Sequence, residues 1–143
     1  MSGKLPNGFR PIKSLYVNID GTCRGNPGPA AIAIIVKDNY GKILEEYKEF
    51  IGKSTNNFAE YKAAIRALEI ALKYCRNKVY LFTDSKLLVN QLLGRYRIRK
   101  KNLLKLLMEI KLLERFFRKV YYFYVEREKN AKADALARSV LTK

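Results

Sequence analysis

The sequence predicts an α/β fold in which a five-stranded mixed sheet is flanked by helices. Three observations support this prediction. The first third of the chain alternates apolar and polar residues as strands do, and later segments repeat apolar residues at the three-and-four spacing of helices. Two short β-branched and aromatic runs separate the helical segments. The resulting order β-β-β-α-β-α-α-β-α, with three antiparallel strands followed by two parallel ones, belongs to the α/β class.

Three strands are expected in the N-terminal third. Residues 14–20 (SLYVNID) alternate between two faces, and a turn rich in Gly, Asn and Pro over 21–29 leads into an apolar strand over 30–38. A hairpin turn over 39–41 then leads into 42–52, where apolar residues stand among charged ones as they do on an edge strand.

The first helical segment begins near Thr55, and its N-terminus has four plausible caps: Ser54, Thr55, Asn56 and Asn57. A short strand over 78–83 (KVYLFT) ends at Asp84. Ser85 then opens a helix that Gly94 ends.

The C-terminal part begins with a basic loop over 95–102 and then predicts a long amphipathic helix, a strand from Val120 and a last helix. The long helix is marked by Leu103, Leu106, Leu107, Ile110, Leu113 and Phe117. The last helix turns Ala133, Leu136, Ala137, Val140 and Leu141 toward the core.

Length and composition indicate one globular domain. We expect residues 1–13 to form a flexible tail and residues 14–143 a single catalytic domain, because 143 residues can bury a core around one sheet. The longest unbroken apolar stretch, 30–36, is far too short to span a bilayer. The two cysteines give no pairing signal. A soluble, cytoplasmic and monomeric protein without a membrane partner is therefore expected.

The net charge of +16, from 29 Lys+Arg against 13 Asp+Glu, points to a polyanionic partner, of which nucleic acid is the commonest. A charged thermophile-like surface is the alternative, but such surfaces usually mix both signs more evenly. The chain contains no histidine. Its absence excludes the usual general base, His-ligated zinc and a Ser-His-Asp triad.

Four acidic residues, Asp20, Glu60, Asp84 and Asp134, stand where the chain is expected to change between strand, turn and helix. Asp20 and Asp84 end strands expected side by side, and ligands of open α/β sheets collect at such ends. Four close carboxylates need cations to stay ionised, and oxygen-only ligands favour Mg²⁺ or Mn²⁺ over zinc. Two ions roughly 3.5–4 Å apart suit an in-line displacement at phosphorus. Each acid taken alone could instead be a cap or a solvated charge.

Four sequence blocks around these acids resemble the signature blocks of type 1 ribonuclease H: IDGTCRGNPGPA, STNNFAEYKAAIRAL, LFTDSKLLVNQL and VEREKNAKADALA. The resemblance runs from about residue 15 to residue 137 and implies the ribonuclease H-like fold. The chain looks most like the compact archaeal and bacterial-homologue branch, in which a short basic link replaces a Trp-rich helical protrusion. The chain has no Trp.

The resemblance implies an endonuclease that hydrolyses the RNA strand of RNA–DNA hybrids, leaves 3′-hydroxyl and 5′-phosphate ends and uses two Mg²⁺ or Mn²⁺ ions. Asp20 would bridge both ions, Asp134 would join it on one of them, and Glu60 and Asp84 would complete the other. Many relatives carry a histidine in the loop before Asp134. Here Arg127 or Glu128 could take that role, and the sequence leaves open which.

The resemblance also implies substrate contacts, for which ordinary turn, cap or solvated-loop roles are the alternative. Contacts to the RNA 2′-hydroxyl are implied for Gly21, Cys23, Asn56 and Glu60. The DNA strand or its phosphates would meet Asn26, Thr55, Asn57 and Asn102. The basic run would hold phosphates through Arg95, Arg97, Arg99, Lys100, Lys101 and Lys105, with Tyr96 between them.

Two other functions fit parts of the pattern. A non-catalytic module that binds RNA–DNA hybrids or double-stranded RNA would explain the charge, but it gives no reason to assemble four repelling carboxylates. A Holliday-junction resolvase or integrase core would share the superfold, but the NNFAEYKAA block disfavours it. The sequence leaves open whether double-stranded RNA is also bound or cut.

Overall fold

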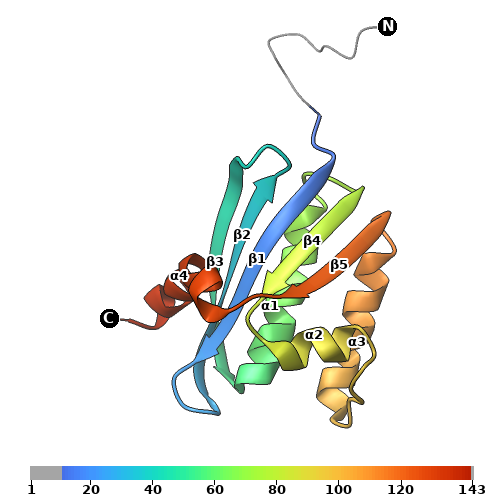
Figure 1. Cartoon of the computed structure of the whole chain (residues 1–143). Helices are drawn as coiled ribbons and strands as arrows, with labels where there is room; N and C mark the ends of the chain where they lie inside the picture. The colour runs from blue at the N-terminus through green and yellow to red at the C-terminus, as the bar shows by residue number, and fades with distance from the viewer. Residues whose placement is uncertain (1–10, 143) are drawn as a thin grey trace, which may run out of the picture.

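The computed structural model describes residues 11–142 and confirms the predicted order of elements (Figure 1). The elements are β1 (Ser14–Cys23), β2 (Gly28–Asp38), β3 (Ile43–Ser54), α1 (Asn56–Ala71), β4 (Lys78–Thr83), α2 (Lys86–Leu92), α3 (Lys101–Glu114), β5 (Lys119–Tyr124), the 3-10 turn η2 (Arg127–Asn130) and α4 (Ala131–Leu141). The tail expected over 1–13 falls mostly on residues 1–10, which lie outside the described residues. Residues 11–13 form no helix or strand.

The five strands form one mixed sheet in the order β3-β2-β1-β4-β5. β1, β2 and β3 pair antiparallel, whereas β4 pairs parallel to both β1 and β5, as predicted. Helices α1 and α3 pack together on one face, and α4 lies against β1, β2 and β3 on the other (Figure 1). Because α4 reaches no further than β1, the sheet is covered unequally on its two sides.

The core lies between the sheet and α1. Alternation along β1 turns Leu15, Val17 and Ile19 toward α1, where they are fully buried with Tyr61 and Leu68. The helix begins where predicted, because the Thr55 hydroxyl accepts a hydrogen bond of 3.2 Å from the Phe58 N–H. These contacts hold the first turns of α1 beside the middle of β1.

Several predicted boundaries were wrong. β1 does not end at Asp20, because its ladder with β2 continues as far as Cys23 and Ala30, so Asp20 lies inside the strand. α3 begins at Lys101, so Lys101 and Asn102 belong to its first turn and not to the basic loop.

The predicted cores of the last two helices also need correction. Phe117 is buried but follows the end of α3 at Glu114. In α4 only Ala133 and Ala137 are fully buried, whereas Leu136, Val140 and Leu141 are half-buried. None of the described helices is long and apolar enough to cross a membrane.

Candidate active site

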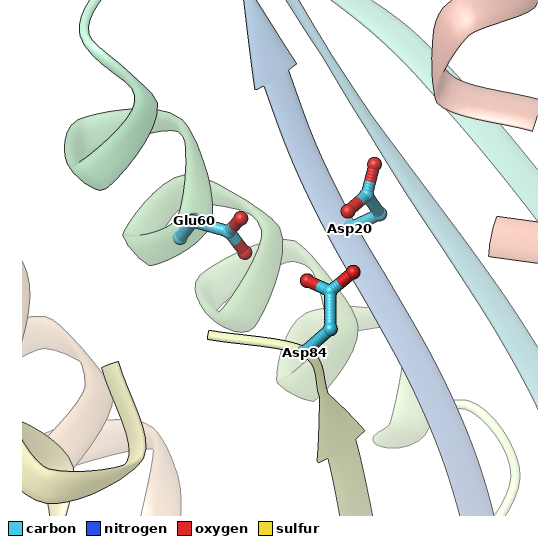
Figure 2. Close-up of side chains that lie close together, drawn as sticks. All are labelled: Asp20, Glu60 and Asp84. Carbon is cyan, nitrogen blue, oxygen red and sulfur yellow. The ribbon is translucent and has the colours of Figure 1, made fainter. Parts of the chain in front are cut away.

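Three carboxylates meet where β4 ends beside β1. The pairing of these two strands stops at Asn18 and Phe82, whereas β1 continues to Cys23. Asp20 lies on this continuation, Asp84 directly follows β4, and Glu60 reaches the same place from the second turn of α1. One carboxylate oxygen from each of the three residues lies within 4.8 Å of the others. Figure 2 shows the three groups turned toward a common point.

Gly21 allows α1 to come this close to β1. A Cβ atom at this position would lie 2.5 Å from the carbonyl carbon of Ala59 and 2.6 Å from the amide nitrogen of Glu60. No side chain fits at that distance, so the strand backbone touches the helix backbone. The Gly21 N–H and the Thr83 hydroxyl donate hydrogen bonds to the Glu60 carboxylate, and both lower its pKa.

Burial dominates the electrostatics of the three acids. Asp20 is 4% exposed, and burial, followed by the charges of Asp84 and Asp134, raises the pKa of Asp20 from 3.8 to about 7, against a smaller lowering by Arg127 and Arg138. Burial, followed by the charges of Asp20 and Asp84, raises the pKa of Glu60 well above its ordinary value despite its two hydrogen bonds. The protein thus gathers carboxylates that resist ionisation unless a cation joins them.

Two of the site's oxygens lack any partner among the described residues. Asp20 Oδ2 and Glu60 Oε2 are buried and accept no hydrogen bond. Buried polar atoms are normally satisfied, because leaving one unpaired is costly. A donor set of carboxylate oxygens with free lone pairs fits a hard divalent cation such as Mg²⁺ or Mn²⁺. The residues present therefore fit the Mg²⁺ or Mn²⁺ ions that the sequence predicts.

Asp134, the fourth predicted ligand, lies at the rim of this group. It stands in the first turn of α4, and its carboxylate pairs with Arg138 at 3.0 Å. Its charge raises the pKa of both Asp20 and Asp84, so it lies near them. It is not one of the three acids whose oxygens lie within 4.8 Å of one another.

Arg127 is the residue of the preceding turn that approaches the acids. Its Nε lies 4.0 Å from Asp84 Oδ2, although the side chain is 80% exposed. Its positive charge lowers the pKa of Asp20 and of Asp84, in Asp84 against a larger raising by burial. Glu128 is exposed on the same turn.

The residues predicted to contact the RNA strand, and several predicted to contact the DNA strand, gather at the N-terminus of α1. The Cys23 thiol donates to Asn56 Oδ1 at 3.0 Å, and Asn26 Oδ1 accepts from the Asn56 backbone N–H at 2.9 Å. Thr55 caps the helix, and Asn57 is half-buried in its first turn. Thr55 and Asn26 thus have the cap and turn roles that were the alternative, and their contact with substrate stays a prediction.

The basic loop contains no helix over residues 93–100, in agreement with a short link in place of a protrusion. The side chains expected to meet phosphates are exposed there: Arg95, Arg97, Arg99 and Lys100, with Lys101 following in α3. Arg95 is held locally, because its guanidinium donates to Asn90 Oδ1 at 3.3 Å. Asn102 accepts from the neighbouring Leu103 N–H at 2.9 Å and is otherwise open to solvent.

Asn130, for which no role was predicted from the sequence, is 1% exposed. Its Nδ2 donates to the Ile19 carbonyl oxygen at 2.9 Å, and its Oδ1 accepts from Asn18 Nδ2 at 3.0 Å. An Asn directly before a helix normally caps it, and that local pattern gave no hint of a partner on β1. The available signal was the polar side chain of Asn18, on the same face of β1 as Asp20.

Comparison with known proteins places this geometry in a family. Residues 18–140 match the family model described as "Reverse transcriptase-like". The ribonuclease H1 of Halobacterium salinarum superposes with a TM-score of 0.86 at 36% identity, over 90% of this chain and 97% of that one. The chain belongs to the type 1 ribonuclease H family.

Two further ribonuclease H structures resemble this one. The N-terminal ribonuclease H domain of a Mycobacterium tuberculosis protein gives a TM-score of 0.84 at 38% identity, over 88% of this chain and 97% of that domain. LC11-RNase H1, solved in complex with an RNA/DNA hybrid, gives 0.83 at 34% identity, over 90% and 99% of the two chains.

The curated relatives of this chain are longer proteins. The chain spans 35% of the length of three mycobacterial proteins, including the bifunctional protein of M. tuberculosis, at 38% identity. It spans 64% of the ribonuclease HI of H. salinarum at 36% identity.

Proposed function

We propose that this ribonuclease H hydrolyses the RNA strand of RNA–DNA hybrids in a metal-dependent reaction that leaves 3′-hydroxyl and 5′-phosphate ends. The observation that carries the proposal is the convergence of Asp20, Glu60 and Asp84, two of which bury an oxygen without a partner. The substrate class is supported by the relative that was solved with an RNA/DNA hybrid.

The same three residues would hold Mg²⁺ or Mn²⁺, with Asp134 at the rim available for the second ion that the sequence predicts. When bound, such ions supply Lewis-acid polarisation of the phosphate and of the attacking water. Gly21 and Thr83 orient Glu60 through their hydrogen bonds. Asn130 anchors the start of α4 to the strand of Asp20, which positions Asp134.

Substrate binding would use the positive surface around these acids. The exposed arginines and lysines of the loop over 93–100 would hold phosphates, and the first turn of α1 with Asn56 would meet the hybrid beside Glu60. The backbone near Gly21 and Cys23 would read the RNA 2′-hydroxyl, the group that distinguishes RNA from DNA.

A pure binding module is the less favoured candidate. Gathering three carboxylates with raised pKa values destabilises the folded state, and binding a polyanion does not offset this unfavourable free energy. Three expectations stay predictions of the sequence: a single catalytic domain, a monomeric state and a cytoplasmic location. Whether double-stranded RNA is also bound or cut stays open.

The proposal is tested by incubating labelled RNA–DNA hybrid, duplex RNA and duplex DNA with the protein in Mg²⁺, Mn²⁺ or chelator. We expect cleavage of the RNA strand of the hybrid only with metal. Asp20→Asn should abolish cleavage and leave hybrid binding intact, whereas Glu109→Gln, an exposed acid on α3, should leave both unchanged. Cleavage in chelator, or undiminished cleavage by Asp20→Asn, would refute the proposal.

A further inference from the structure

Aromatic rings line the sheet face that α4 leaves uncovered. Tyr16 on β1, Tyr80 on β4 and Tyr121 on β5 are register partners, so their side chains point the same way. Phe82 and Phe123 form a second row, nearer the carboxylates. Among the described residues no helix lies over β4 and β5 on this side (Figure 1).

The rings stack across the strands, which leaves free ring faces at the sheet edge. Tyr16 and Tyr80 have centroids 5.0 Å apart with planes 8° from parallel, and Tyr80 and Tyr121 are 4.9 Å apart at 9°. Parallel rings at this spacing close off each other's faces. Because β5 is the last strand, the outer faces of Tyr121 and Phe123 meet no further ring row, and Phe123 is 42% exposed.

Sheet stability alone does not account for these outer rings. Cross-strand aromatic pairs stabilise a sheet, which explains the inner members of each row. An edge strand has no neighbour on its outer side, and proteins usually protect such edges with charge, proline or a covering element. β5 instead carries the rings of Tyr121 and Phe123 on its uncovered face.

Two lysines lie beside these rings. Lys78 and Lys119 are register partners on the same face as the rings, and Lys119 Nζ lies 5.7 Å from the centre of the Tyr121 ring. We call the rings of Tyr121 and Phe123 with Lys78 and Lys119 the aromatic edge.

We propose that the aromatic edge binds single-stranded nucleic acid, whose unpaired bases stack on the rings while the lysines contact phosphates. Stacking platforms beside cations bind single strands because every unpaired base offers a free ring face. A duplex hides those faces between its base pairs. Binding here requires neither a metal ion nor a hybrid, so the inference goes beyond the proposed function.

The aromatic edge lies on a strand that leads toward the carboxylates. β5 runs toward Arg127, whose guanidinium approaches Asp84. A strand lying along β5 is thereby directed toward the candidate active site. An unpaired extension of a hybrid would be bound in this way while its duplex part lies at the acids.

Charge disfavours two other occupants. A second copy of the chain would bring together two molecules that each carry +16. The N-terminal segment over 1–13 contains Lys4, Arg10 and Lys13 and no acidic residue, so the lysines of the edge would repel it. A polyanion carries the complementary charge.

The test measures fluorescence anisotropy of labelled oligouridylate and oligodeoxythymidylate in chelator, which prevents cleavage. We expect both to bind the wild type, and the double variant Tyr121→Ala/Phe123→Ala to bind at least about tenfold more weakly. Phe50→Ala removes an exposed ring of β3 far from the edge and should bind as the wild type does. Cleavage of a blunt hybrid should be unchanged in all three proteins.

A gentler variant and a crosslink keep the proposal testable if the double variant fails to fold. Phe123→Leu keeps an apolar side chain and should still weaken binding, and a photoreactive oligouridylate should crosslink within 119–124. Equal affinity of wild type and Phe123→Leu, or crosslinks confined to the loop over 93–100, would overturn the proposal. So would a dimer of the wild type that these variants dissociate in the absence of oligonucleotide binding.

Discussion

The side-chain amide of Asn130 donates a 2.9 Å hydrogen bond to the backbone carbonyl oxygen of Ile19, the residue before Asp20. The same side chain accepts a hydrogen bond from Asn18. This one buried amide therefore links the beginning of α4 to β1, the strand that carries Asp20. Since Asp134 lies in the first turn of α4, this link positions it relative to Asp20.

Replacement of Asn130 by alanine tests that link. The change leaves the Ile19 carbonyl and the Asn18 amide without their partner, and we expect the free energy of unfolding to fall by about 1–3 kcal/mol. Cleavage should also require a higher Mg²⁺ concentration, because Asp134 is no longer held. Urea unfolding and a Mg²⁺ titration of activity measure the two effects.

The control is Asn77→Ala, which removes an exposed amide that donates to the Lys13 carbonyl far from the acids. It should leave the Mg²⁺ dependence unchanged. If Asn130→Ala is destabilised but keeps the wild-type Mg²⁺ dependence, the amide is structural only.

The fold was predictable from sequence because its signals are local. Alternation along residues 14–20 and caps at Thr55 and Ser85 each depend on a few neighbouring residues, and the structure shows the predicted strand there and both capping hydrogen bonds. Convergence of Asp20, Glu60 and Asp84 was predictable because the strands of the two aspartates were expected side by side and Glu60 in the first turns of a helix. The strand limit at Asp20 was wrong because a Gly-Thr-Cys segment that looks like a turn continues the ladder with β2.

The features that were not predictable from the sequence depend on contacts between distant segments. Asn130 and Ile19 are 111 positions apart, and no local pattern pairs them. The place of Asp134 at the rim results from how α4 lies on the sheet and from its pairing with Arg138. The stacked face of Tyr80 likewise becomes visible only once the register of three strands is known.

The raised pKa of Asp20 predicts an unusual pH dependence of stability in chelator. Between its ordinary pKa of 3.8 and about 7, the folded protein holds a proton that the unfolded chain has released. The contribution of this group to the free energy of unfolding therefore falls as pH rises through that interval, by up to about 4 kcal/mol.

Melting temperatures of wild type and Asp20→Asn in chelator, from about pH 4 to about pH 8, measure this effect. The variant should be the more stable protein at the upper end of this pH range, and Mg²⁺ should restore the melting temperature of the wild type there. Glu109→Gln should follow the wild type at every pH. A constant difference between wild type and Asp20→Asn would contradict the assignment.

The pH profile of cleavage tests whether Arg127 or Glu128 takes the role of the histidine that relatives carry in the loop before Asp134. The Arg127 guanidinium lowers the pKa of Asp84 and Asp20, so Arg127→Ala should raise both and move the rising limb of the profile to higher pH. Glu128→Ala should leave the profile in place. A shift produced by Glu128→Ala and not by Arg127→Ala would assign the role to the acid.

The basic loop predicts a steep salt dependence of hybrid binding. Each phosphate contact contributes about one unit to the slope of log affinity against log salt concentration. Arg97→Gln/Arg99→Gln should reduce the magnitude of that slope by about two, as measured with uncleaved hybrid in chelator. Lys42→Gln, in the hairpin between β2 and β3, should leave it unchanged. Equal slopes for loop variant and wild type would show that the loop is only solvated.

Gly21→Ala tests the contact between β1 and α1 on which the position of Glu60 depends. The added methyl group would lie 2.5 Å from the Ala59 carbonyl carbon, so strand and helix must move apart. We expect a loss of at least about 2 kcal/mol of stability and a loss of cleavage larger than the unfolded fraction explains. Gly41→Ala is the control, because it strains a turn with φ of 86° but meets no atom within 4 Å. If Gly21→Ala loses stability while its folded fraction cleaves at the wild-type rate, the spacing between β1 and α1 does not control the site.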